Sequence, residues 1–295
     1  MPEPSGRETD HSGMTALHLM PPLKTKPLSD ALGLEVLDVD LREPLSPTRV
    51  AQVREAWYEG LVLLLRDQSL TEEDQVRFAE HFGPLGKTLN VHNTGRHPAI
   101  MLISNIRKDG KPIGALPDGE MQFHTDQCYI ERPVAASMLY AIEVPSVGGN
   151  TMFANAYRAY ETLPAEIKGR LDGRKAINAY DYDNAATFRG TRIREGVPHY
   201  AHPVVRTHPA TGRKALYVNR LMTIAIEGLP EAESDELLNF LFDHQEQRRF
   251  VYEHVWHVSD ILMWDNRCTL HARTDFSSTE RRLMRRITVL GERPV

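Results

Sequence analysis

Short segments with the patterning of β-strands recur along most of the chain, and this recurrence limits the fold to a few classes. Residues 61–65 are wholly apolar, which is typical of a strand buried on both faces. Residues 34–41 alternate apolar with acidic side chains, which indicates a strand with one exposed face. Further runs of strand length lie at 100–103, 135–141, 151–154, 204–208, 214–218, 251–256, 260–264 and 284–291. Many short strands of this kind predict a mainly β fold of the α+β class, built as a double-sheet jelly roll.

A few helices are expected outside these strands. Ser46 is suited to cap one helix, and Thr71 is followed by three acidic residues that favour a second helix N-terminus. Residues 231–249 have the apolar spacing of a helix, and residues 156–171 have it with an interruption at Pro164.

Three stretches lack regular patterning. Residues 85–122 collect Gly, Pro, Asn and Lys, and we expect 100–103 to be their single strand. Residues 173–196 are rich in Asn, Asp and Tyr, so we expect a mobile segment that closes over bound ligands. Residues 1–26 are rich in Pro, Ser, Gly and charge, which predicts a disordered tail before a single domain at 27–295.

The composition excludes several classes of protein. A net charge of -5 and a pI near 6.2 argue against a nucleic-acid-binding protein. No apolar run approaches the roughly 18 residues of a membrane span, and the N-terminus lacks a secretory signal. The two cysteines, Cys128 and Cys268, lie far apart and do not imply a disulfide framework. These features predict a cytoplasmic protein with no membrane partner.

The pair His124-x-Asp126 is the first candidate for chemistry. On a strand the two side chains point to the same face and offer one imidazole nitrogen and one carboxylate oxygen as adjacent metal ligands. Alone, the pair is a weak signal, and His271 by itself is more often a core or surface histidine. Together, two histidines and one carboxylate with open positions are typical of the facial triad of non-haem Fe(II) oxygenases.

Several longer motifs accompany these residues. In chain order they are LGLEVLDVDL at 32–41, FGPL at 82–85, HTD at 124–126, VPSVGGNT at 144–151, GRKALYVN at 212–219 and WDNR at 264–267, ahead of His271. With these motifs, the chain from about residue 28 to 289 resembles the Fe(II)/2-oxoglutarate-dependent dioxygenases of the taurine dioxygenase and 2,4-D dioxygenase (TauD/TfdA) family. The resemblance implies a double-stranded β-helix core with flanking helices, assembled as a homodimer or homotetramer.

The resemblance also implies roles for particular residues. His124, Asp126 and His271 match the family's Fe(II) ligands, which leave positions for 2-oxoglutarate and O2. Arg282 follows His271 by eleven residues, and Thr151 follows Asp126 by 25; both match the residues that hold the distal carboxylate of 2-oxoglutarate. The presence of Asp126 favours hydroxylation over halogenation.

The substrate is expected to be a small anionic molecule. Arg286 lies four residues beyond Arg282 and matches a substrate-binding arginine, which suggests a carboxylate, sulfonate, sulfate ester or aryloxyalkanoate. An ion pair beside the site is the competing interpretation of Arg286. His92 and Asn90 lie in the irregular stretch before the HTD motif and are candidate substrate contacts. The product is either a hydroxylated compound or the fragments of its cleavage.

Two other functions remain open from the residues. A jelly-roll protein that binds metal or ligand without turnover is one, and a zinc hydrolase with the same ligands is the other. His199, His202 and His208 lie near one another in sequence, but no carboxylate stands at a suitable spacing, so a second metal site is not expected. Cys128 and Cys268 are expected to pack, and Asp265 with Asn266 to hold the turn before His271 or to orient a ligand.

Overall fold

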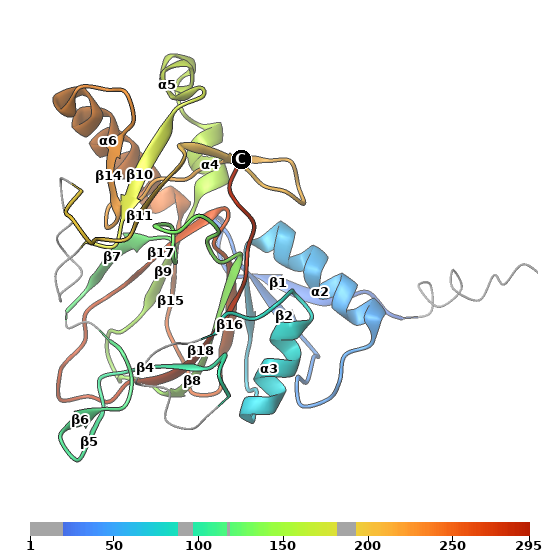
Figure 1. The fold of residues 1–295 in the computed structure, drawn as a ribbon. Helices are drawn as coiled ribbons and strands as arrows, with labels where there is room; N and C mark the ends of the chain where they lie inside the picture. The colour runs from blue at the N-terminus through green and yellow to red at the C-terminus, as the bar shows by residue number, and fades with distance from the viewer. Residues whose placement is uncertain (1–19, 88–96, 117–118, 182–192) are drawn as a thin grey trace, which may run out of the picture.

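Two β-sheets that face one another form the centre of the molecule (Figure 1). The computed structural model describes residues 20–87, 97–116, 119–181 and 193–295. In spatial order, the seven-stranded sheet consists of β1 (Lys24–Pro27), β2 (Leu34–Leu37), β3 (Val62–Leu65), β16 (Ile261–Asp265), β8 (Ala136–Glu143), β18 (Leu283–Val289) and β4 (Met101–Ser104). The four-stranded sheet consists of β15 (Val251–His254), β9 (Thr151–Asn155), β17 (Thr269–Arg273) and β7 (Met121–His124).

Strand β3 shows how the core is divided. All four of its residues are buried, as the apolar run predicts. Val62 and Leu64 belong to the cluster between the two sheets, which also contains Phe153 of β9. Leu63 and Leu65 belong to a second cluster on the outer face of the seven-stranded sheet. Successive side chains of a strand point to opposite faces, so β3 contributes to two cores at once.

Two helices cover the outer face of the seven-stranded sheet: α2 (Pro47–Gly60) and α3 (Glu72–Glu80) (Figure 1). Both begin where the sequence predicts. The Ser46 hydroxyl accepts a hydrogen bond from the backbone N–H of Arg49. Thr71 and Asp74 form a capping box, which satisfies backbone N–H groups that a helix N-terminus leaves without partners.

A further layer of helices and short strands lies beyond one end of the two sheets (Figure 1). It contains α4 (Ala156–Glu161), α5 (Ala165–Leu171), α6 (Glu231–Gln245), the 3₁₀ turn η2 (Arg248–Phe250), the sheet β11 (His199–Pro203), β10 (Lys175–Ala179) and β14 (Thr223–Ile226), and the hairpin β12 (Val205–Thr207) and β13 (Lys214–Leu216). Pro164 separates α4 from α5, as expected. A small hairpin of β5 (Arg107–Lys108) and β6 (Lys111–Pro112) lies apart from this layer.

The structure corrects several boundaries. Residues 24–26, expected in the tail, belong to β1, because their backbone pairs with β2 although their side chains are exposed. The strand expected over 34–41 ends at Leu37, since Asp38 has a positive φ of 57°. Residues 85–122 contain β5, β6 and β7 as well as β4, and residues 173–196 contain β10. Residues 182–192 of that second segment lie outside the described residues.

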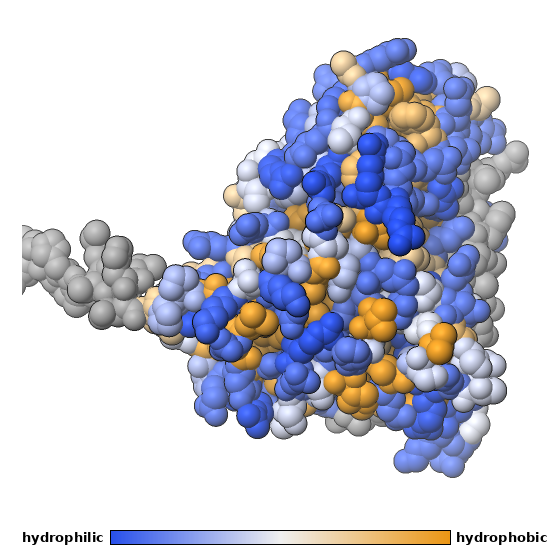
Figure 2. All heavy atoms as spheres, turned by 180° about the vertical axis from the view of Figure 1, so that it is seen from behind, coloured by the Kyte–Doolittle hydropathy of each residue, from blue (hydrophilic) through white to orange (hydrophobic). Residues whose placement is uncertain are grey.

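The described part of the chain is mainly β with a few helices, as predicted. None of its helices has both the length and the apolar character needed to cross a membrane. On the face opposite to that of Figure 1, apolar side chains are visible as separate groups among hydrophilic ones (Figure 2).

Candidate active site

The structure brings His124, Asp126 and His271 together beside the β7 edge of the four-stranded sheet. His124 is the last residue of β7, and the β7–β17 register places it directly opposite His271. The two imidazole rings have centroids 4.0 Å apart, and His271 Nε2 lies 3.9 Å from Asp126 Oδ2. The three side chains can each offer a ligand atom within 4.8 Å of the others.

The protonation states of this cluster suit a divalent cation. The Nδ1 atom of His124 lies 2.9 Å from the Gln122 carbonyl oxygen, so it carries the proton and leaves Nε2 with a lone pair. Burial lowers the pKa of His124, and it lowers the pKa of His271 to about 3, so both rings are neutral at pH 7. Two neutral imidazoles and one carboxylate, with no thiolate, form a donor set that suits Fe(II).

Asp126 is an anion although it is buried. Burial opposes its ionisation, but the positive charge of Arg286 and a hydrogen bond from Ser137 hold its pKa well below the usual range. Ser137 Oγ donates to Asp126 Oδ2 at 2.6 Å, and Arg286 Nη1 lies 3.3 Å from Oδ1. The carboxylate is therefore held on both sides before any metal binds.

A cavity of about 750 Å³ opens beside the cluster. Thr151, Arg282 and Arg286 all line it together with His124, Asp126 and His271. Thr151 begins β9, and its hydroxyl accepts a hydrogen bond from the Trp256 indole at 3.0 Å. Six of the eight residues expected at the site therefore border one common space.

Arg282 is a buried cation. Its side chain is almost completely buried, and no carboxylate of the described residues forms an ion pair with it. Burial, with a contribution from the nearby charge of Arg273, lowers its pKa to about 9. A buried charge without a counter-ion costs free energy, which an anionic ligand can recover.

Arg286 forms an ion pair with Asp126, as the competing interpretation of its role expected. Besides its contact with Asp126, its Nη2 donates to the Met101 sulfur at 3.4 Å. Its side chain nevertheless remains 23% exposed and lines the cavity, so the guanidinium has room for a further anion. His92 and Asn90 lie outside the described residues.

Four other residues in or beside the cavity were not singled out from the sequence. Arg273 lines it and stands opposite Thr151 in the β9–β17 register. The alternation of polar residues at 269, 271 and 273 with apolar ones at 270 and 272 was the available signal, and it also marks β17, which was not predicted. Tyr129 and Tyr180 line the cavity as a ring pair with centroids 4.8 Å apart. Ser137, the donor to Asp126, comes from β8 of the other sheet.

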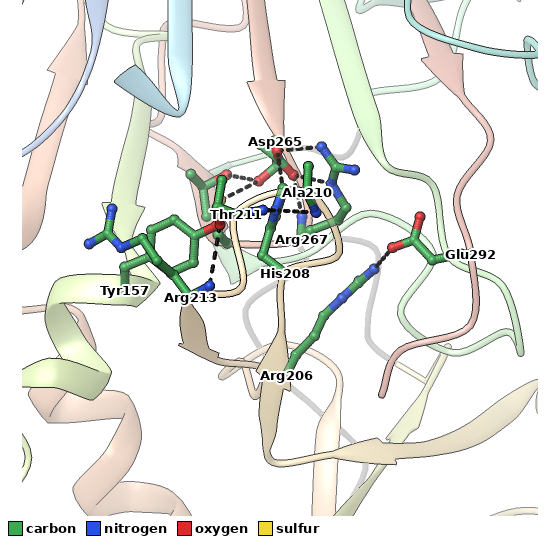
Figure 3. A network of polar contacts seen from close by, with 11 residues as sticks. Tyr157, Arg206, His208, Ala210, Thr211, Arg213, Asp265, Arg267 and Glu292 are labelled. Atoms are coloured by element: carbon green, nitrogen blue, oxygen red, sulfur yellow. Dashed lines mark hydrogen bonds and ion pairs between the residues drawn. The ribbon is translucent and has the colours of Figure 1, made fainter. Parts of the chain in front are cut away.

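A second buried polar network lies around Asp265 (Figure 3). His208, for which no carboxylate was expected, has its Nε2 atom 3.0 Å from Asp265 Oδ2. Asp265 also holds the turn before His271, because its Oδ1 accepts from the backbone N–H of Arg267 at 2.9 Å. Cys128 and Cys268 are both buried and free.

A mainly β fold whose cavity joins a His-Asp-His cluster to a buried arginine fits the class of non-haem iron oxygenases that use a keto acid. The family model "Taurine catabolism dioxygenase TauD, TfdA family" matches residues 24–288. The chain belongs to this family. It is a 2-oxoglutarate-dependent dioxygenase, an enzyme that uses Fe(II), 2-oxoglutarate and O2.

Similar proteins agree with this family. The chain is 34% identical over 288 residues to an alpha-ketoglutarate-dependent 2,4-dichlorophenoxyacetate dioxygenase of Cupriavidus pinatubonensis, which covers 90% of this chain and 97% of the relative. It is 32% identical to an (S)-phenoxypropionate/alpha-ketoglutarate-dioxygenase of Sphingobium herbicidovorans, over 93% of this chain and 97% of the relative. A crystal structure of a taurine dioxygenase from Burkholderia xenovorans superposes with a TM-score of 0.79 at 32% identity, covering 93% and 91% of the two chains. A non-catalytic binding protein and a zinc hydrolase are not favoured by these matches.

Proposed function

We propose that His124, Asp126 and His271 hold Fe(II), that Thr151 and Arg282 hold the distal carboxylate of 2-oxoglutarate, and that Arg286 binds the anionic group of the substrate. The observation that carries this proposal is the common cavity: the three metal-binding groups and the uncompensated Arg282 border the same space. When bound, iron supplies the activation of O2 that is coupled to decarboxylation of the keto acid.

The residues of the chain bind and orient the reactants. Two neutral imidazoles and one carboxylate leave roughly three positions of an octahedral ion for other ligands. The planar guanidinium of Arg282 suits a carboxylate because it can donate two parallel hydrogen bonds. Thr151 adds a hydroxyl beside it, whose orientation is set by the Trp256 indole.

The charge of the cavity supports a negatively charged substrate. Among the described lining residues there are three guanidiniums, on Arg273, Arg282 and Arg286, against the single carboxylate of Asp126. A ferrous ion adds two positive charges. Arg282, Arg286 and the metal together therefore outweigh Asp126 and the dianion of 2-oxoglutarate, which leaves an excess positive charge for a second anion without counting Arg273.

The apolar part of the lining supports a substrate with a hydrophobic group. Tyr129, Tyr180, Met101, Met121 and Met222 border the cavity and offer aromatic and polarizable surface. The named relatives act on 2,4-dichlorophenoxyacetate and phenoxypropionate, and the structural neighbour is a taurine dioxygenase. We propose a small carboxylate, sulfonate, sulfate ester or aryloxyalkanoate. Where the hydroxylated carbon bears an ether oxygen, the product breaks into an alcohol and a carbonyl compound.

Succinate formation tests this proposal. Purified protein with Fe(II), 2-oxoglutarate and air is incubated with a panel of aryloxyalkanoates, alkyl sulfonates, sulfate esters and simple carboxylates. At least one anionic member is expected to raise succinate release well above the rate without substrate, and neutral analogues of the same shape are expected not to. If the protein binds metal and keto acid but no member of the panel raises succinate release, the substrate belongs to a different class.

We further infer a double-stranded β-helix core, a single catalytic domain over 27–295, a homodimer or homotetramer, and a cytoplasmic location. The two facing sheets and a family match over 24–288 support the fold and the domain. Light scattering coupled to size-exclusion chromatography measures the oligomeric state, and a monomeric mass would contradict that part of the proposal.

A further inference from the structure

A chain of buried hydrogen bonds leads from the larger sheet to Asp126. The Trp264 indole Nε1 lies 3.0 Å from Asn266 Oδ1, and Asn266 Nδ2 lies 3.0 Å from Ser137 Oγ. Ser137 Oγ in turn lies 2.6 Å from Asp126 Oδ2. Trp264, Asn266 and Ser137 are at most 1% exposed, so water does not compete for these bonds.

The direction of every bond in this chain is determined by its two ends. An indole N–H can only donate, so the side-chain oxygen of Asn266 must face Trp264 and its NH2 group must face Ser137. An ionised carboxylate can only accept, so the single hydroxyl proton of Ser137 must point to Asp126. The Ser137 oxygen is then free to accept from Asn266. A short O–H···O⁻ contact of this kind is a strong, charge-assisted hydrogen bond.

The chain is anchored in the rigid part of the molecule. Ser137 on β8 stands directly opposite Trp264 on β16 in the antiparallel register, and the backbone N–H of Asn266 donates to the Ala135 carbonyl at 2.9 Å. Asp126 instead follows β7 of the smaller sheet. The Ser137 hydroxyl, on a strand of the larger sheet, therefore holds the Asp126 carboxylate, which lies next to the smaller sheet.

Asp126 has a competing partner. Arg286 Nη1 lies 3.3 Å from the other carboxylate oxygen, Oδ1. If the bond to Oδ2 were absent, the carboxylate could rotate and present both oxygens to the guanidinium, because arginine favours a two-pronged contact with carboxylates. The bond from Ser137 opposes that rotation.

We propose that Ser137 and Asn266 are positioning residues, which hold the Asp126 carboxylate in the orientation that binds the metal and prevent its capture by Arg286. This inference rests on the proposed role of Asp126 as a metal ligand. Neither residue touches the reactants. Outer partners of metal ligands of this kind typically contribute about 10- to 100-fold to metal affinity.

The test measures Mn(II) binding by the electron paramagnetic resonance signal of the free ion, without 2-oxoglutarate, and the thermal midpoint of each metal-free variant. Ser137→Ala is expected to raise the Kd for Mn(II) by about 10- to 100-fold, and Ser137→Thr, which keeps the hydroxyl, is expected to stay near the wild type. Ser234→Ala is the matched control, because Ser234 is also buried and accepts from the Ile226 backbone N–H at 2.9 Å, away from the site. It is expected to lower the midpoint and leave the Kd unchanged.

The outcomes separate this inference from the proposed ligand set. If Asp126→Ala abolishes Mn(II) binding while Ser137→Ala binds within about twofold of the wild type, the positioning role is overturned and the ligand role stands. If Asp126→Ala binds Mn(II) normally, the ligand set itself fails. Should Ser137→Ala not fold, Asn266→Ala and Ser137→Thr decide: the proposal requires weaker Mn(II) binding in the first and near-normal binding in the second.

Discussion

The cluster His124–Asp126–His271 and the cluster His208–Asp265–Cys268 contain similar chemical groups, and in each the potential ligand atoms lie within 4.8 Å of one another. All six residues are buried. They differ in what already occupies their lone pairs. The first cluster borders a cavity of about 750 Å³. In the second, both carboxylate oxygens of Asp265 and the Nδ1 lone pair of His208 already accept hydrogen bonds from protein groups.

In the second cluster, hydrogen bonds from protein groups already occupy the acceptor atoms of Asp265 and His208 (Figure 3). Arg267 donates to both oxygens of Asp265, from Nε at 2.8 Å and from Nη2 at 2.7 Å. His208 Nδ1 accepts from the backbone N–H groups of Ala210 and Thr211, both at 3.2 Å, so its Nε2 carries the proton and donates to Asp265. A cation could enter only by expelling a guanidinium. The comparison teaches that lone pairs left open, rather than the kinds of residue gathered, distinguish a metal site from a structural network.

Removing one histidine from each cluster gives the largest contrast. His271→Ala is expected to abolish succinate formation and Mn(II) binding, because one of three metal-binding groups is lost. His208→Ala is expected to keep metal affinity and to lower the free energy of unfolding by about 1–3 kcal/mol, since a buried hydrogen bond is lost. Turnover, Mn(II) titration and urea unfolding measure the three quantities. A His208→Ala protein that folds but no longer binds Mn(II) would break the comparison.

The next largest effect is expected on the free energy of unfolding when Arg267 of the second cluster is replaced. Burial opposes the ionisation of Asp265, but Arg267 and His208 hold its pKa well below the usual range. Arg267→Ala leaves this buried anion without its main partner and is expected to cost about 3–5 kcal/mol of unfolding free energy. Arg281→Ala, which removes an exposed pair with Glu143, is the control and is expected to change stability very little. Equal losses in the two variants would contradict the buried network.

Replacing Arg282, unlike replacing Arg267, is expected to stabilise the ligand-free protein. Its pKa is lowered to about 9 by burial, so the fold disfavours its charge when no anion is bound. Arg282→Met is therefore expected to raise the thermal midpoint of the ligand-free protein while raising the KM for 2-oxoglutarate by about 10- to 100-fold. At the same concentration, 2-oxoglutarate should stabilise the wild type more than the variant. A variant with an unchanged KM would remove Arg282 from the co-substrate site.

The cysteines give the smallest expected effect. Burial raises the pKa of Cys268 well above its usual range and that of Cys128 to about 12. The thiolate is the reactive form, so alkylation of the native protein by iodoacetamide should stay negligible from pH 7 to 9 and become fast in urea. Mass spectrometry reads both states. Rapid native labelling of Cys268 would show that the second cluster opens to solvent.

Local features of the fold could be predicted from the sequence because local forces determine them. The caps at Ser46 and Thr71 and the two-sided burial of β3 follow from side chains within a few residues of each other. The end of β2 at Leu37 was missed because the alternation of apolar and acidic residues continues to Leu41, although the backbone leaves the extended conformation at Asp38.

The site could be predicted only in part, because its geometry depends on contacts between segments that lie far apart in the sequence. The spacing of His124 and Asp126 indicates two adjacent ligands, although β7 ends at His124 and Asp126 follows it rather than lying on the strand. The pairing of β7 with β17 depends on contacts between distant segments. Ser137 carries no motif of its own, and its role depends on the facing of two sheets. The network of His208 was missed because its carboxylate partner lies 57 residues away in sequence.

The last of the three proposed metal ligands, His271, stands on β17, which pairs with β9 on one side and β7 on the other. During synthesis, His124 and Asp126 leave the ribosome long before His271 exists. A nascent polypeptide thus carries two of the three proposed protein ligands, and the third is added only when β17 is made. The proposed site is therefore complete only after β17 has been inserted between β9 and β7.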